Sequence, residues 1–321
     1  MSLCDFQLYL KKLTNGEPLS GEEALVAAHA PLDELSDFAF QVQKNFAPSY
    51  ELCAIVNGKS GHCSEDCRYC AQSSFFKTTS ECYSLKDEKF LDKAFSAACG
   101  QELNYFSVVT SGRSLSADEV RRLASAYRRW SASGCTGICC SHGLLGTEEF
   151  RILATAGVSR YHCNLETSRR YFPYVCTTHS YDDKIRTIRE AQAAGLEVCS
   201  GGIIGMGETW QDRADMALEL RRLGIRSVPL NFLSPISGTA FESLSPPVPE
   251  TAYRVFALFR MLLPDAFLRL SGGRSALPEA GIPLFAAGAN AAITGDLLTT
   301  SGGVADSDRA AIADVRSRLL V

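Results

Sequence analysis

The sequence predicts an α/β fold of the (β/α)8 barrel type, also called a TIM-type barrel, with an N-terminal helical extension. Three observations indicate it. Eight short apolar runs recur after residue 50, longer segments with helical periodicity separate them, and a glycine follows several of these segments where a helix would end. Alternating strands and helices are typical of a parallel sheet covered by helices, and eight repeats favour closure into a barrel.

The helical extension covers residues 1–50. Ser20 and the residues up to Glu23 form a typical helix start, and residues 33–45 carry apolar side chains at helical spacing. The barrel itself is expected over residues 51–300. A Gly-, Ser- and Asp-rich tail that ends in a short helix is expected over residues 301–321.

The barrel elements follow in order. The apolar runs predict strands at 52–56, 105–110, 137–140, 160–165, 197–204, 227–233, 267–270 and 291–294. Helical patterning predicts helices at 116–130, 181–194, 210–223 and 251–262. Gly157, Gly195 and Gly224 each stand where a helix would end before the next strand.

Composition excludes several classes of protein. A net charge of −4 gives no electrostatic case for nucleic acid. No run of 18 apolar residues and no basic start with an apolar core occurs, so neither a membrane partner nor a signal peptide is expected. Thirteen cysteines in a chain that is 46% hydrophobic fit a cytoplasmic protein with metal-bound, oxygen-sensitive thiolates better than a disulfide framework.

Directly after the first predicted strand, a loop holds Cys63, Cys67 and Cys70 with C-x3-C-x2-C spacing. Thiolates suit soft metals and iron–sulfur clusters, and three ligands leave one position of a four-iron cluster open for chemistry. The position also fits, because ligands of parallel α/β folds bind at the carboxyl ends of strands. The alternatives are three unrelated cysteines or a zinc loop that borrows a distant ligand, and the absence of a second C-x2-C pair disfavours zinc.

This loop resembles the signature of radical S-adenosylmethionine (SAM) enzymes. The resemblance implies that Cys63, Cys67 and Cys70 hold a 4Fe–4S cluster whose fourth iron is chelated by SAM. Tyr69 matches the aromatic residue that lies against the adenine in that superfamily.

Further stretches are similar to the biotin synthase family, in its order and at its spacing. They are residues 57–61, 71–73, 106–113, 161–168, 177–181, 199–209, 227–231, 269–274 and 288–300. The resemblance implies a sulfurtransferase that inserts sulfur between two unactivated C–H positions of dethiobiotin to form biotin. Acid–base chemistry cannot reach such positions, whereas a radical made from SAM inside an enclosed barrel can.

The resemblance also implies the SAM contacts. Residues 201–208 fit G-x-I-x-G-x-x-E, and Gly202, Ile203 and Glu208 belong to that motif. Asn164 and Glu166 match polar positions that meet the SAM ribose. Glu166 stands where the family more often has Asp, so its arm is longer.

Two more positions follow from the same resemblance. Lys184 replaces an Arg that faces the SAM carboxylate, which keeps the charge but loses bidentate geometry. Asn164 and Asn231 match positions that hold dethiobiotin. For each polar residue the alternative is an ordinary hydrogen bond at a strand end.

The family carries a second, auxiliary cluster inside the barrel that supplies the sulfur. Cys139, Cys199 and Arg269 stand at three of its usual ligand positions, but the fourth is Ser107, a poor ligand for soft iron. Cys53, on the neighbouring first strand, stands where the family more often has serine. We therefore expect a variant set of Cys53, Cys139 and Cys199.

This set could hold the usual 2Fe–2S cluster or a four-iron cluster that carries an extra sulfide, and we expect such variants in strict anaerobes. Arg269 has an alternative role as a buried cation that does not touch iron. Cys176 is the reserve ligand.

The remaining cysteines compete for these roles. Cys140 and Cys163 neighbour inward-facing residues and should point outward. Cys4, Cys82, Cys99 and Cys135 are expected to be free, buried, small apolar residues.

Other functions remain as alternatives. A hydrogenase-maturase-like or methylornithine-synthase-like radical SAM enzyme would not need the inner cysteines together with Arg269. A non-catalytic iron–sulfur electron carrier would leave the SAM motif unused. The resemblance further implies a reducing partner such as flavodoxin or ferredoxin, the iron–sulfur assembly machinery and a homodimer.

Overall fold

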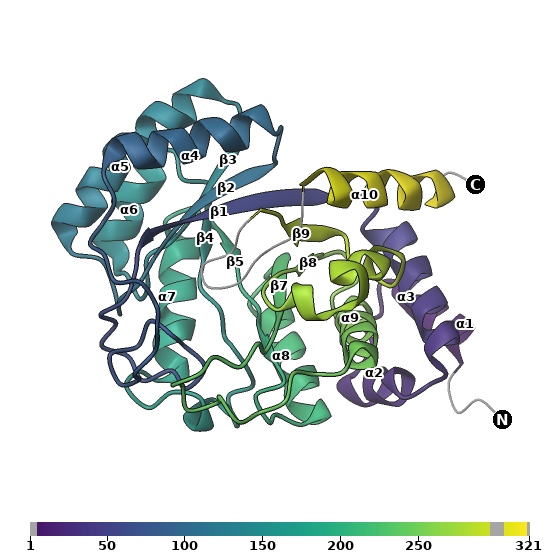
Figure 1. Ribbon diagram of the computed structural model, residues 1–321. Coiled ribbons are helices and arrows are strands. Elements are labelled where there is room, and N and C mark those ends of the chain that lie inside the picture. The colour runs from purple at the N-terminus through teal and green to yellow at the C-terminus, as the bar shows by residue number, and fades with distance from the viewer. Residues whose placement is uncertain (1–4, 296–304, 320–321) are drawn as a thin grey trace.

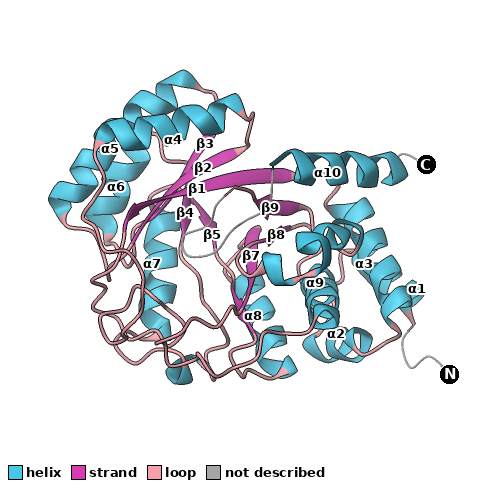
Figure 2. Ribbon diagram, in the orientation of Figure 1, coloured by secondary structure: helices cyan, strands magenta, loops and turns pink. Residues whose placement is uncertain are grey.

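The computed structural model describes residues 5–295 and 305–319 and shows a parallel barrel surrounded by helices (Figure 1 and Figure 2). Within these residues, the strands are β1 (Glu51–Lys59), β2 (Tyr105–Thr110), β3 (Gly137–Ser141), β4 (Arg160–His162), β5 (Glu197–Cys199), β6 (Gly202–Ile204), β7 (Ser227–Phe232), β8 (Phe267–Leu270) and β9 (Ala291–Ile293). All neighbours pair in parallel, and β5 and β6 both pair with β7, which closes the barrel. The predicted (β/α)8 fold is confirmed.

Helices cover the outside of the barrel. They are α4 (Glu88–Gly100), α5 (Ala117–Ser133), α6 (Thr147–Thr155), α7 (Tyr181–Ala193), α8 (Trp210–Arg222) and α9 (Pro249–Leu262), with 3-10 segments η1 (Phe172–Tyr174), η2 (Arg274–Ala276) and η3 (Pro278–Ala286). Ser116, Ser180 and Thr209 begin α5, α7 and α8 with capping boxes. Each capping side chain accepts a backbone N–H that has no partner within the helix.

The predicted single strand at 197–204 is interrupted. Cys199 pairs with Ser227 and Gly202 pairs with Leu230, so the register continues, but the two residues between them make no ladder pair. Pro229 lies opposite this gap and has no N–H to donate to the ladder. The strand therefore splits into β5 and β6.

The expected helical extension consists of α1 (Phe6–Thr14), α2 (Gly21–Ala28) and α3 (Leu32–Phe46). Ser20 caps α2 with a capping box, as its sequence predicts. The rings of Phe6 and Phe38 stack at 4.6 Å between centroids and join α1 to α3. Helices α2 and α3 pack against α9, beside the barrel rather than over its mouth (Figure 1).

The C-terminal helix is longer than expected. It is α10 (Ala305–Leu319), which packs against η3, and it has the same length as α3. Arg274 and Asp308 form a fully buried, two-pronged ion pair at 2.6 and 2.9 Å, which holds α10 to the barrel. Residues 296–300, at the end of the stretches similar to biotin synthase, lie outside the described residues, as does Cys4.

Three cysteines, Cys82, Cys99 and Cys135, differ from the expectation of free, buried thiols. Cys99, at the end of α4, forms a disulfide with Cys135, just before β3, and their Cα atoms are 5.5 Å apart. They meet because α4 and α5 deliver the chain to the neighbouring strands β2 and β3 at the same end of the barrel. Cys82 is also different, because it is exposed.

His142 is a buried histidine just after β3. Its Nδ1 lies 3.0 Å from Thr110 Oγ1 and its Nε2 lies 2.8 Å from the Tyr127 hydroxyl, with the side chain 1% exposed. Burial lowers the pKa of His142 to about 3. The folded protein therefore holds a neutral ring, whereas the unfolded chain takes up a proton below pH 6.5.

We predict that this difference makes stability fall as the pH falls below 6.5. Between pH 7 and 5 the wild type should lose about 2 kcal/mol of unfolding free energy through this one group. A His142→Gln variant, which cannot titrate, should lose correspondingly less over the same interval. Urea denaturation at the two pH values measures the effect, and equal losses in both proteins would contradict it.

Among the described residues, no helix has both the length and the apolar character needed to cross a bilayer.

Candidate active site

A cavity of about 360 Å³ runs inside the barrel. Alternate residues of the strands line it, as the two-residue period of strand side chains requires. On β4 and just beyond it these are Arg160, His162 and Asn164. The cavity has two ends: Tyr69 and Cys70 of the cysteine loop lie at one, and the inner cysteines with Arg269 lie at the other.

The cysteine loop is fixed by its own backbone and by two carboxylates. Cys63 N donates to Gln72 O at 3.0 Å and Cys70 N donates to Cys67 O at 2.9 Å. Asp66 accepts hydrogen bonds from the backbone N–H groups of Thr177 and Thr178, at 2.8 and 3.1 Å. The segment before α7 thereby clasps the loop that carries the three thiols.

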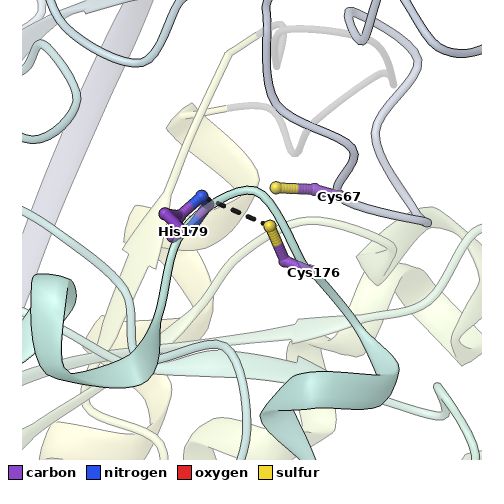
Figure 3. Close-up of side chains that lie close together, drawn as sticks. All are labelled: Cys67, Cys176 and His179. Atoms are coloured by element: carbon purple, nitrogen blue, oxygen red, sulfur yellow. Dashed lines mark hydrogen bonds between the residues drawn. The ribbon is translucent and has the colours of Figure 1, made fainter.

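The second carboxylate of this clasp is Glu65. It lies 2.6 Å from His179 Nδ1 and 3.2 Å from Arg113 Nη1, and both Glu65 and His179 are buried. Cys176 belongs to the same segment, and Figure 3 shows its sulfur beside Cys67. The structure thus places the reserve ligand Cys176 at the outer loop and not with the inner cysteines.

The residues similar to the SAM ribose contacts lie at the carboxyl end of β4. Glu166 has a positive φ of 71°, unusual for a residue other than glycine. Asn164 Nδ2 lies 3.3 Å from Glu166 Oε2, and Asn164 Oδ1 accepts the Gly201 N–H at 3.0 Å. Asn164 is therefore partly engaged in a strand-end hydrogen bond, while both residues line the cavity beside Tyr69.

Glu208 and Lys184, which the resemblance also assigns to SAM, do not line the cavity as Asn164 and Glu166 do. Glu208 accepts backbone N–H groups of Gly205 and Met206 and pairs with Arg213 at 2.7 Å, so it shapes the turn and does not line the cavity. Burial would lower the pKa of Lys184, but its neighbours Cys163 and Glu166 outweigh this and raise it. Lys184 keeps its charge near the end of the cavity that carries the cysteine loop.

Gly201 and Gly202 let the backbone of β6 approach its neighbours closely. A Cβ at Gly201 would lie 1.9 Å from Pro229 O, and one at Gly202 would lie 2.4 Å from Glu166 O. Ile203, the next residue, lines the cavity. The glycines of the motif thus serve packing of the backbone at the site.

We predict that Gly201→Ala destabilises the protein by about 1–3 kcal/mol, because its methyl group would collide with a backbone carbonyl that cannot move freely. Gly100→Ala is the matched control, since a Cβ there meets no atom within 4 Å and φ is not positive. Denaturant midpoints of the two variants measure the difference. Equal midpoints would contradict the prediction, because they would show that the strand carrying Pro229 moves to accommodate the new methyl group.

Asn231 lines the cavity on β7, yet the backbone already uses its amide. Nδ2 donates to Gly202 O at 3.0 Å, and Oδ1 accepts the Gly272 N–H at 2.9 Å. One amide hydrogen of Nδ2 remains for a ligand. Asn231 therefore also links β6 to the turn that follows β8, in addition to any role in binding a ligand.

Three thiols from three strands face the inner end of the cavity: Cys53, Cys139 and Cys199. Burial raises the pKa of Cys53 to about 11 and that of Cys139 to about 12. Burial would also raise the pKa of Cys199, but a hydrogen bond with His162 and the charge of Arg269 lower it to about 6.

Cys53 does not lie beside Ser107 in register. Cys53 pairs with Tyr105, and Ser107 pairs with Ile55 on one side and with Cys139 on the other. The Cys53 thiol is thus displaced by two residues, about 6.6 Å, toward the amino end of its strand. Ser107 Oγ is buried and forms no hydrogen bond.

Arg269 connects this thiol to a chain of buried charges. Its Nη1 donates to Cys53 Sγ at 2.8 Å and its Nη2 donates to Glu51 at 2.7 Å. Glu51 also pairs with Arg160 at 2.9 Å, and Arg160 pairs with Glu197, whose side chain is 64% exposed. A guanidinium held this way is a cation and a donor.

The sequence interpretation missed Glu51, Arg160 and His162. The sequence did offer a signal for two of them. Arg160 and His162 stand four and two residues before Asn164, so the two-residue period of a strand predicts that they face the same cavity. Cys140 and Cys163 lie between inward-facing residues, and both are buried in the core outside the cavity.

The donor atoms of the site fit iron–sulfur clusters. Two groups of three thiols, one on the loop and one inside, are the ligands that iron–sulfur clusters take. The buried hydroxyl of Ser107, which lines the cavity without a hydrogen-bond partner, marks polar space near the inner group that protein atoms do not fill.

The chain is similar to known proteins over most of its length. Residues 59–220 match the radical SAM superfamily, and residues 229–316 match the biotin and thiamin synthesis associated domain. A biotin synthase of Akkermansia muciniphila is 44% identical over 307 residues, which cover 95% of this chain and 96% of that protein. One of Clostridium perfringens is 43% identical over 317 residues, which cover 98% and 99%.

Solved structures support the fold alone. Methylornithine synthase superposes with a TM-score of 0.77 at 17% identity, covering 97% of this chain and 95% of that one. A maturase of the [FeFe]-hydrogenase superposes with a TM-score of 0.80 at 14% identity, covering 97% and 74%. The sequence relatives, by contrast, match this chain at more than 40% identity over nearly its full length, and the chain belongs to the biotin synthase family of radical SAM enzymes.

Proposed function

We propose that this chain forms biotin from dethiobiotin, with SAM bound at the cysteine loop and with sulfur drawn from a cluster inside the barrel. One observation carries the proposal. A single cavity joins Cys70 and Tyr69 at one end to Cys53, Cys139 and Cys199 at the other, so a substrate between them reaches both.

In this proposal Cys63, Cys67 and Cys70 hold the 4Fe–4S cluster and Cys53, Cys139 and Cys199 hold the auxiliary cluster. When bound, these groups supply a carbon-centred radical made from SAM at one end of the cavity and the sulfur atom at the other. The protein then has to position the substrate, exclude water and keep the reactive groups apart.

The cavity residues divide this work. Ile55, Val109 and Ile293 give an apolar wall for the hydrocarbon part of dethiobiotin, and Asn231 offers its free amide hydrogen. Tyr69, Asn164 and Glu166 surround the outer end, where SAM would lie. Lys184 would face the SAM carboxylate with a single ammonium charge, without the two-pronged hydrogen bonding that an arginine offers.

Arg269 takes the alternative role in this proposal: it donates to Cys53 and does not bind iron. Its two terminal nitrogens, Nη1 and Nη2, donate to Cys53 and Glu51, and a protonated guanidinium has no lone pair to give. Arg269 and Arg160 then place two cations beside an anionic cluster. Because Arg269 does not bind iron in this proposal, the three thiolates leave the fourth iron of a four-iron cluster free to carry an extra sulfide, which favours that cluster over the usual 2Fe–2S cluster.

The family supports four further proposals. A flavodoxin or ferredoxin supplies electrons, and the iron–sulfur assembly machinery loads the clusters. The chain works as a homodimer, and it lies in the cytoplasm. The match of almost the whole chain to biotin synthases supports these roles by family alone.

The test is anaerobic incubation of the reconstituted protein with SAM, a reductant and dethiobiotin. We expect 5′-deoxyadenosine and biotin. An electron carrier would make neither product, and another radical SAM enzyme would make no biotin. An anomalous iron map of crystals grown without oxygen would place the irons and the thiols that touch them.

A further inference from the structure

Beside Cys67 lie two buried side chains that the proposed reaction does not use. Cys176 and His179 are 3% and 8% exposed, and their donor atoms and the sulfur of Cys67 all lie within 4.8 Å of one another (Figure 3). The two residues come from the segment between η1 and α7, more than a hundred residues from the cysteine loop. A second thiol is thus held against a proposed cluster ligand.

His179 does not accept a hydrogen bond from Cys176. Its Nδ1 lies 2.6 Å from Glu65 Oε2 and 3.2 Å from Cys176 Sγ. Since a carboxylate can only accept, Nδ1 carries a hydrogen and donates it to Glu65 at the shorter distance. The ring therefore fixes the place of Cys176 without taking its thiol hydrogen.

Asp66 is the next candidate acceptor, with its Oδ1 3.2 Å from Cys176 Sγ. That oxygen already accepts the backbone N–H groups of Thr177 at 2.8 Å and Thr178 at 3.1 Å, while the Thr178 hydroxyl lies closer to Glu65 Oε2, at 2.9 Å. The two backbone donors fill the two lone-pair sites of that carboxylate oxygen. A stronger acceptor nearby would draw the thiol hydrogen away from it.

Cys67 becomes such an acceptor when it binds iron. A metal-bound cysteine is a thiolate, which carries negative charge and has no hydrogen to donate. Cys176 Sγ lies within 4.8 Å of that sulfur, and the negative charge of a neighbouring thiolate favours the protonated form of Cys176. The hydrogen bond would then run from Cys176 to Cys67.

We propose that Cys176 is a positioning residue that donates its thiol hydrogen to the iron-bound sulfur of Cys67, and that the His179–Glu65 pair holds it there. Hydrogen bonds to cluster sulfurs change reduction potentials, and a donor stabilises the more electron-rich, reduced state. The contact therefore raises the reduction potential of the cluster that cleaves SAM. This inference rests on the proposed assignment of Cys67 as a ligand.

The test measures the reduction potential of the loop cluster in the reconstituted full-length protein, by redox titration followed with electron paramagnetic resonance. Cys176→Ala and the similarly sized Cys176→Val remove the donor and should shift the potential to more negative values. Cys176→Ser keeps an O–H donor, so its reduction potential should lie close to that of the wild type. Cys140→Ala, a buried thiol on the far side of β3, is the matched control and should leave the potential unchanged.

Each possible result of the titration either supports or overturns the proposal. A negative shift in Cys176→Ala or Cys176→Val that Cys176→Ser reverses supports the proposal. An unchanged or more positive potential in either donor-free variant overturns it, and so does a Ser variant that behaves like Val. A Cys67→Ala protein that still holds the loop cluster would instead refute the ligand assignment, which separates the two failures.

Discussion

A Cys70→Ala variant is expected to lose the loop cluster and with it all cleavage of SAM. The remaining Cys63 and Cys67 cannot hold three irons of a four-iron cluster. Loss of an outer-shell partner alone costs metal sites 10–100-fold, so loss of a ligand should lower formation of 5′-deoxyadenosine by more than about 100-fold. Iron per chain should fall by about the four irons of one cluster.

The matched control for Cys70→Ala is Cys82→Ala. Cys82 is an exposed thiol that follows the loop and does not line the cavity, so its removal should change neither iron content nor SAM cleavage. Cleavage by Cys70→Ala at the level of the control would show that the loop is not the ligand set. Measuring iron, sulfide and 5′-deoxyadenosine on the same samples separates loss of the cluster from loss of SAM binding.

The order of elements could be predicted from the sequence because buried parallel strands and their covering helices follow distinct periods. The interruption between β5 and β6 could not, because Gly201 and Pro229 meet only in the folded barrel. The disulfide between Cys99 and Cys135 is another long-range contact. No local pattern shows that two helix ends lie side by side.

The candidate site divides in the same way. The loop cysteines carry their own spacing, and the inner thiols follow from resemblance to the family and from strand alternation. The clasp of Glu65 and Asp66 on residues 176–179 bridges more than a hundred residues, and so does the pair of Glu51 with Arg160. Such contacts depend on the register of the barrel, which the sequence leaves open.

A Cys53→Ala variant is expected to lose iron and sulfide of the auxiliary cluster while it keeps the loop cluster. Cys139 and Cys199 would remain as two thiols, and Arg269 would point its donor at an empty position. SAM should still be cleaved at the outer end of the cavity, but the carbon radical would find no sulfur. Biotin should fall by more than about 100-fold while 5′-deoxyadenosine persists, since a ligand matters more than an outer-shell partner. Cys140→Ala, with its thiol outside the cavity, should keep both products. Unchanged auxiliary iron and sulfide in Cys53→Ala would discard the variant ligand set.

The exchange variant Cys53→Ser with Ser107→Cys takes this test one step further, because it returns the thiol to the second strand. Ser107 pairs with Cys139 in register, and its unpartnered hydroxyl shows that a polar atom of this strand reaches the inner end without a protein partner. The thiol would move about 6.6 Å along the barrel. If the shape of the thiol set decides the cluster, the exchange should restore bound iron and sulfide but with fewer irons per chain and a different Mössbauer spectrum. If iron content and spectrum match the wild type, Arg269 and the cavity, and not the position of Cys53, would determine which cluster the barrel holds.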